Sequence, residues 1–256
     1  MSRISKAFDN KKAFIAFLTA GDPNKEKTTE YILAMAEAGA DIVEIGIPFS
    51  DPTAEGPVIQ AANLRALNGG INTEAVFGIA ESVRKKSDVP LVFLTYINPV
   101  FKYGYERFFA RCSETGVDGI IIPDLPFEEI NEISGTAQKH GVDIIPLVAP
   151  TSQNRIQKIA MAASGYVYIV SSMGVTGMRN QIKTDIKQIV NTVRTVTDVP
   201  AAVGFGISTP EQAKSMAEIA DGVIVGSAIV KIIEQHGENA SQELKDYITR
   251  MKSAIN

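Results

Sequence analysis

Cysteine and histidine are scarce in this chain of 256 residues, which contains one cysteine and two histidines. The lone cysteine, Cys112, excludes a disulfide framework and a cysteine metal site within one chain. It falls in a helical pattern and is expected to be a small buried residue. The histidines, His140 and His236, fall at the outer ends of expected helices. A Ser-His-Asp triad and a multi-histidine metal site are therefore excluded, and no metal is expected.

Long apolar runs and basic clusters are also missing. No stretch approaches the roughly 18 uninterrupted apolar residues of a membrane helix, and the N-terminus lacks the apolar core of a signal peptide. The 25 basic and 29 acidic residues give a net charge of −4 without a basic block, which argues against nucleic acid as a partner. The chain is expected to be soluble and cytoplasmic, with no membrane contact.

Two phosphate-binding motifs and a strand lysine that could form a Schiff base are absent as well. The chain has neither a Walker loop nor a GxGxxG sequence, because Gly204-Phe-Gly206 lacks the third glycine at the required offset. No lysine lies inside an apolar run, which argues against an aldolase that forms a Schiff base within a barrel. Carboxylate acid–base chemistry is the reaction type that remains.

Eight short apolar runs alternate with longer amphipathic stretches, a pattern typical of parallel strands covered by helices. Eight such units in 256 residues predict an α/β fold, a single (β/α)8 TIM barrel formed by residues 1–256 as one domain. An open doubly wound sheet is the alternative, since alternation alone does not show closure. The runs are residues 13–20, 42–47, 91–96, 119–123, 144–149, 166–171, 201–206 and 223–226.

Short phrases recur four units apart along the chain. Asp88-Val-Pro90 before the third run matches Asp198-Val-Pro200 before the seventh. Gly116-Val-Asp-Gly119 before the fourth run resembles Ile219-Ala-Asp-Gly222 before the eighth. These matches favour a barrel of two similar halves, although turn phrases also recur by chance.

Two glutamates are the first candidates for chemistry. Glu44 interrupts an apolar run, where a strand has no structural use for a charge, and Glu55 follows in the next loop. A carboxyl group in apolar surroundings has a raised pKa, which suits a general acid or base. Asp22 and Asp124 follow the first and fourth runs, so the mouth of the barrel is expected to be acidic. The alternative for Glu44 is a structural carboxylate bonded to a backbone or hydroxyl group.

The last two runs end in glycine-rich phrases that lead directly into helical segments, Gly204-Phe-Gly-Ile-Ser208 and Gly226-Ser-Ala-Ile229. Exposed N–H groups at a helix N-terminus bind phosphate without lysine, and barrels often use these two loops for that purpose. The alternative is that these glycines only make tight turns. Residues 173–184, after the sixth run, are expected to form a loop that covers the site as a lid.

Several longer phrases occur in a fixed order and together are highly specific. They are Phe17-Leu-Thr-Ala-Gly-Asp-Pro23, Glu44-Ile-Gly-Ile-Pro-Phe-Ser-Asp-Pro52, Ala62-Asn-Leu-Arg-Ala66, Gly174-Val-Thr-Gly177 and Gly226-Ser-Ala-Ile-Val-Lys231. On these phrases the chain resembles the alpha chain family of tryptophan synthase over nearly its full length.

The resemblance implies a barrel without a cofactor that cleaves indole-3-glycerol phosphate to indole and glyceraldehyde 3-phosphate, a retro-aldol step in tryptophan biosynthesis. It assigns the main acid–base role to Glu44, places Glu55 near the indole nitrogen and places Tyr168 beside Glu44. The remaining implied substrate contacts are Phe17, Leu94, Ile121, Val148, Thr176, Gly177, Phe205, Gly206, Gly226 and Ser227, with Ile224 or a neighbour.

The chain departs from the family pattern at two positions. The family usually has aspartate where this chain has Glu55, so the second carboxylate stands on a side chain that is one methylene longer. Many relatives carry arginine where this chain has Ser172, which bears on closure of the lid.

The resemblance also implies a partner, a pyridoxal phosphate-dependent beta chain that receives indole through a channel within an alpha–beta heterotetramer. It would dock near Asp51, Pro52 and the segment from Tyr96 to Phe101. Two alternatives stay open. The chain serves mainly as an allosteric partner with weak chemistry of its own, or it is a stand-alone lyase that releases free indole.

Overall fold

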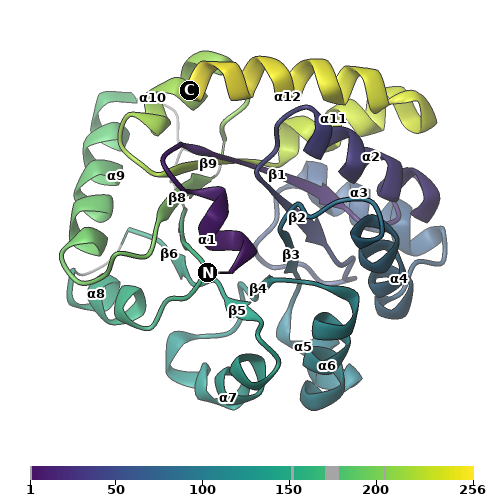
Figure 1. Ribbon diagram of the computed structural model, residues 1–256, viewed down its shortest axis with the longest axis horizontal. Coiled ribbons are helices and arrows are strands. Elements are labelled where there is room, and N and C mark those ends of the chain that lie inside the picture. Colours follow the sequence, from purple (N-terminus) through teal and green to yellow (C-terminus); the bar gives the residue numbers. More distant parts are fainter. Residues whose placement is uncertain (1, 151–152, 171–178, 205) are drawn as a thin grey trace.

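The structure, a computed structural model, describes residues 2–150, 153–170, 179–204 and 206–256, without the side chains of residues 179–184. Within these residues, nine parallel strands form one sheet in the order β5-β4-β3-β2-β1-β9-β8-β7-β6. Figure 1 shows the strands curled around a centre with the helices outside them. The strands are β1 (Ala13–Thr19), β2 (Ile42–Gly46), β3 (Leu91–Leu94), β4 (Gly119–Ile121), β5 (Asp143–Ile144), β6 (Leu147–Val148), β7 (Val167–Val170), β8 (Ala201–Gly204) and β9 (Gly222–Val225).

The helices fill the intervals between the strands, and some of them follow a residue whose side chain caps the first turn. Asn24, Asn72 and Thr209 each accept a hydrogen bond from a backbone N–H in the first turn. Within the described residues, no helix is long and apolar enough to cross a membrane. The helices are α1 (Arg3–Ala7), α2 (Lys25–Glu37), α3 (Pro57–Asn68), α4 (Thr73–Arg84), α5 (Ile97–Tyr103), α6 (Tyr105–Thr115), α7 (Asn131–Lys139), α8 (Gln153–Met161), α9 (Arg179–Arg194), α10 (Pro210–Ala217), α11 (Ser227–His236) and α12 (Ser241–Ile255).

The fifth predicted strand is split into two short pieces, β5 and β6. β5 pairs with β4, whereas β6 pairs with β7. Between them, the N–H of Ile145 donates to the carbonyl of Ile120 at 2.9 Å, and the carbonyl of Pro146 accepts from Tyr168 at 3.0 Å. Pro146 has no N–H with which to continue the ladder to β4. The barrel therefore closes through this interrupted strand, which confirms the (β/α)8 prediction and excludes the open sheet.

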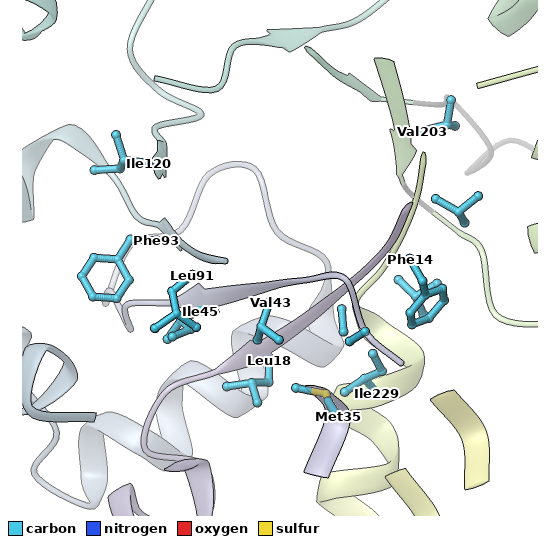
Figure 2. Packing of buried hydrophobic residues seen from close by; sticks show 14 of the residues in the cluster. Phe14, Leu18, Met35, Val43, Ile45, Leu91, Phe93, Ile120, Val203 and Ile229 are labelled. Atoms are coloured by element: carbon cyan, nitrogen blue, oxygen red, sulfur yellow. The ribbon is translucent and has the colours of Figure 1, made fainter. Parts of the chain in front are cut away.

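Alternate residues of each strand face either the helices or the barrel interior. In β2, Val43 and Ile45 belong to the layer between strands and helices, while Ile42 belongs to the interior cluster. Figure 2 shows this helix-facing layer, with Met35 of α2 beside the strand residues. Glu44 shares the face of Ile42, so the alternation alone directs its carboxyl group into the barrel.

The repeated phrases have the same structural role in both halves of the barrel. Asp118 and Asp221, each directly before a strand, accept a hydrogen bond from the first N–H of a neighbouring strand, at Leu91 and Ala201 respectively. Each aspartate also pairs with the arginine that ends a helix, Arg84 of α4 and Arg194 of α9. The repetition in the sequence thus reflects equivalent junctions rather than chance.

The helix α1, which the sequence pattern did not predict, lies across the centre of the ring in Figure 1. Ile4 and Ala7 are buried with interior residues of the strands, and Arg3 pairs with Asp118 at 2.8 Å. A helix of five residues is too short to produce a recognisable hydrophobic period. It covers the end of the barrel at which the strands start, and the C-terminal ends of the strands remain as the entrance.

Candidate active site

A cavity of about 470 Å³ opens at the C-terminal ends of the strands, where βα-barrel enzymes carry their active sites. Apolar side chains from the strands form its depth, and the loops after β2 and β8 and the start of α11 form its rim. The lining residues are Phe17, Glu44, Ala54, Glu55, Gly56, Val58, Ile59, Leu94, Pro123, Leu147, Tyr168, Val170, Gly206, Ile207, Ser208, Ile224, Gly226, Ser227, Ala228 and Lys231.

A larger hollow of about 900 Å³ lies at the opposite end, beside the starts of β1, β8 and β9. Its cations already have partners, since Lys12 Nζ donates to the carbonyl of Ala220 at 2.7 Å and Arg194 pairs with Asp221 at 2.7 Å. These contacts join neighbouring strand starts. We therefore place the chemistry in the smaller cavity.

Glu44 lies between Phe17 of β1 and Val92 of β3 in the register of the sheet. Its side chain is buried, with 1% exposed, and its Oε1 accepts a hydrogen bond from the hydroxyl of Tyr166 at 2.5 Å. Burial raises the pKa of Glu44 from 4.5 to about 7, against the opposing effect of the Tyr166 hydrogen bond. The hydroxyl partner that a purely structural role of Glu44 would require is therefore present, and Glu44 also lines the cavity.

Tyr166 and Tyr168, two residues apart at the start of β7, both lie near Glu44. Tyr168 lines the cavity, and burial followed by the charge of Glu44 raises its pKa well above 10. Tyr166 lies deeper, against Phe8, with ring centroids 5.9 Å apart. The resemblance to the family implies a site role for Tyr168 and not for Tyr166. The spacing of two residues was a usable signal, because side chains two apart on a strand share a face.

Two glycines make room for the aromatic walls. A Cβ atom at Gly46 would lie 2.8 Å from the ring of Phe17, and one at Gly204 would overlap the ring of Tyr168. Any larger residue at either position would displace a ring that lines the cavity. These strand glycines therefore shape the site, in addition to any role in turns.

Glu55 is held in the loop between β2 and α3 by contacts to its backbone, its loop and its carboxylate. Gln60 Nε2 donates to the backbone carbonyl of Glu55 at 2.7 Å, and the hydroxyl of Tyr96 accepts from the N–H of Ala54 at 3.1 Å. Asn63 Nδ2 donates to Glu55 Oε2 at 2.5 Å. Burial raises the pKa of Glu55 from 4.5 to about 7, with the Asn63 hydrogen bond acting in the opposite direction.

The part of the rim formed by the start of α11 has the features of an anion site. Helix α11 starts at Ser227, and its N-cap residue, Gly226, has no side chain to satisfy the first amides. Gly206, with φ of 77°, and Lys231 also line the cavity. Lys231 was not predicted as a site residue, although it stands four residues after Ser227 and therefore on the same face of the helix.

Two predicted contacts lie elsewhere. Ile121 belongs to the interior cluster of the barrel and is not among the cavity residues. The placement of Val148 at the cavity is wrong, since it packs in the layer between strands and helices. Leu147 lines the cavity instead, because adjacent strand residues face opposite sides: Ile145 and Leu147 pack with the barrel interior, whereas Ile144 and Val148 pack in the helix-facing layer.

Several predictions fall outside the described residues. Thr176, Gly177, Phe205 and Ser172 belong to these, as does the first part of the expected lid. The backbone of residues 179–184 lies within helix α9, so the second part of that expected loop is helical.

The mouth of the barrel is less acidic than predicted. Asp22 is buried and forms two hydrogen bonds with the guanidinium group of Arg65 on α3, at 3.0 and 2.8 Å. Asp124 accepts from the N–H of Ile97 at 2.9 Å, at the start of α5. Neither aspartate lines the cavity. Among the described residues, no group of three His, Cys, Asp or Glu side chains is arranged to hold a metal ion.

The fold and the cavity define the class of the protein, a βα-barrel enzyme whose side chains suit acid–base chemistry on a small molecule. Residues 4–256 match the family described as Tryptophan synthase alpha chain. The alpha chain of Lacticaseibacillus casei is 51% identical over 255 residues, which cover 100% of this chain and 96% of that one. This chain therefore belongs to the tryptophan synthase alpha chain family.

Solved structures agree with this assignment. The crystal structure of tryptophan synthase subunit alpha from Legionella pneumophila str. Paris superimposes with a TM-score of 0.91 at 38% identity, covering 100% of this chain and 98% of that one. A chain of the tryptophan synthase complex from Pyrococcus furiosus gives a TM-score of 0.86 at 36% identity, covering 94% and 98%.

Proposed function

We propose that this chain is the subunit of tryptophan synthase that cleaves indole-3-glycerol phosphate to indole and glyceraldehyde 3-phosphate. The observation that carries the proposal is the position of Glu44, a buried carboxyl group that faces the same cavity as the open N-terminus of α11. The apolar walls suit the indole ring, and the helix N-terminus suits the phosphate. One substrate would thus have its ring beside Glu44 and its phosphate at Gly226 and Ser227.

The proposed chemistry needs one group that both gives and takes a proton. Protonated Glu44 gives its proton to indole C3, and the carboxylate that results takes the proton of the adjacent side-chain hydroxyl. The carbon–carbon bond then breaks, its electrons return to the ring, and the hydroxyl carbon becomes the aldehyde of glyceraldehyde 3-phosphate. Glu44 ends each cycle protonated, as it began.

Glu55 would act on the positive charge that the ring acquires. Protonation at C3 places this charge on the indole nitrogen, where an ionised carboxylate stabilises it or accepts the N–H proton. The pKa of each glutamate is raised to about 7, so one can be protonated while the other is ionised near neutral pH. We therefore expect a bell-shaped pH profile, with Glu55 responsible for the acid limb and Glu44 for the alkaline limb.

The proposal includes a beta chain as partner and acceptor of indole. The similar chain from Pyrococcus furiosus belongs to a tryptophan synthase a2b2 complex. In the expected docking segment, Tyr96 and Val100 are buried, whereas Phe101 is 67% exposed. Asp51 is also exposed. A large apolar side chain left open to solvent suits a protein contact, so we assign the docking role to Phe101 and its exposed neighbours.

The direct test is release of indole from indole-3-glycerol phosphate, measured with and without a tryptophan synthase beta chain. We expect release in both conditions. Glu44→Gln should lower turnover by about a hundredfold or more, with an unchanged circular dichroism spectrum. Glu243→Gln, on the exposed surface of α12, is the matched control. Absence of indole in both conditions would refute the proposal, and absence of a mixed complex in size-exclusion chromatography would indicate a stand-alone lyase.

A further inference from the structure

Asn63 is the only polar residue among the buried positions of α3, which are Ala62, Asn63 and Ala66. Its side chain is 3% exposed. A buried amide requires a hydrogen-bond partner, and Nδ2 of Asn63 donates to Oε2 of Glu55 at 2.5 Å. An amide nitrogen only donates, so this contact favours the carboxylate that accepts it over the protonated acid.

The neighbouring contacts of this loop act on its backbone. Gln60 holds the carbonyl of Glu55, and Tyr96 holds the N–H of Ala54. Within the described residues, Asn63 is therefore the side chain that fixes the carboxylate itself. A glutamate has more rotamer freedom than a shorter acid, and ordering it costs more conformational entropy. A contact at one carboxylate oxygen restricts that freedom and leaves the other oxygen to receive a proton.

The charged and titratable groups that face Glu55 come from other elements. Glu44 on β2 and Lys231 on α11 line the same cavity. Tyr96 follows β3; burial raises its pKa to about 12, and the charges of Glu55 and of Asp124, after β4, act in the same direction. Asn63 is neutral at every pH, so its effect on Glu55 is a constant dipole.

We propose that Asn63 is a positioning residue that fixes the carboxyl group of Glu55 and favours its ionised form, which is required to receive the indole proton. The inference rests on the proposed function and adds a residue to it. It also explains how this chain uses glutamate at this site, because the amide donor fixes the end of the longer side chain. Asn63 itself is not among the residues that line the cavity.

The test compares Asn63→Leu with Gln60→Met in the complex with a tryptophan synthase beta chain. Both substitutions keep the approximate side-chain volume and remove one donor to Glu55, from the carboxylate in the first case and from the backbone in the second. The measurement is kcat and KM for indole-3-glycerol phosphate between pH 5.5 and 9. The unfolding free energy of each variant is measured in parallel.

We expect Asn63→Leu to move the acid limb upward by about one pH unit, the effect of losing a hydrogen bond to a charged group. At pH 6, kcat/KM should fall about tenfold, with less than about a twofold change at pH 8.5. The alkaline limb should stay in place, and Gln60→Met should shift neither limb. If the leucine variant does not fold, Asn63→Asp takes its place. This substitution keeps the side-chain size and adds a second carboxyl group, so it should move the acid limb at least as far.

The outcomes separate the two proposals. No indole from the wild-type complex would refute the proposed function. Indole from the wild type, with an acid limb that neither Asn63 variant moves, would overturn the role of Asn63 alone. A uniform loss of rate at every pH, with both limbs in place, would also overturn it and would indicate a purely structural residue.

Discussion

Replacing Glu44 by glutamine should remove catalysis and, above neutral pH, stabilise the folded protein. Glutamine has nearly the same size as glutamate, and its side-chain oxygen can still accept the hydrogen bond from Tyr166. The substitution therefore removes the titration of a buried group and little else. A site built for proton transfer holds a charge that the fold does not favour, so function and stability should respond in opposite directions.

The magnitude and sign follow from the raised pKa of Glu44. Between the unfolded pKa of 4.5 and the folded pKa of about 7, the folded state binds more protons, so stability falls as pH rises through this window. Raising a pKa from 4.5 to about 7 corresponds to about 3 kcal/mol, at about 1.4 kcal/mol per tenfold change in the proton equilibrium. The Glu44→Gln variant does not lose this stability as pH rises, because its side chain at this position does not titrate. Its stability relative to wild type should rise by about 3 kcal/mol between pH 4.5 and pH 8.

The assay is urea unfolding of wild type and variant at pH 5, 6, 7 and 8, followed by circular dichroism. The titrations of other groups cancel in the difference between the two proteins, provided that the denaturant slopes agree. Glu243→Gln, which changes an exposed carboxylate, should show a nearly constant difference. If the difference for Glu44→Gln is equally constant from pH 5 to pH 8, then Glu44 is not desolvated in the folded state, and the basis of its acid–base role is lost.

Three further substitutions address other parts of the site. Tyr166→Phe removes the hydrogen bond that lowers the pKa of Glu44, so the alkaline limb of kcat/KM should move upward by about one pH unit, and an unmoved limb would contradict this. Gly204→Ala should push the ring of Tyr168 into the cavity and raise KM severalfold. An inhibitor-binding titration would check this effect, and an unchanged far-ultraviolet spectrum would show that the fold is kept. Ser227→Ala should weaken binding of inorganic phosphate by about tenfold, and calorimetric titration that finds equal affinity would remove Ser227 from the anion site.

The local sequence pattern predicts most of the fold because strands and helices have different periods. All eight apolar runs contain strands, and the alternation within β2 correctly turned Glu44 inward. The short helix α1 and the helix α5 were missed, since segments of five and seven residues carry too little periodicity. The split of the fifth strand at Pro146 was also missed, and Val148 was assigned to the cavity wall although alternation from Ile145 places Leu147 there.

The sequence by itself determined the order of the elements, the face of each regular strand and the presence of a carboxylate in an apolar interior. Only the tertiary structure decided which groups that carboxylate meets. Tyr166 reaches Glu44 across a separation of 122 positions, and Asp22, predicted at the mouth, is bound instead by Arg65. Periodicity acts between near neighbours, whereas such contacts depend on closure of the whole barrel, which brings distant strands and helices together.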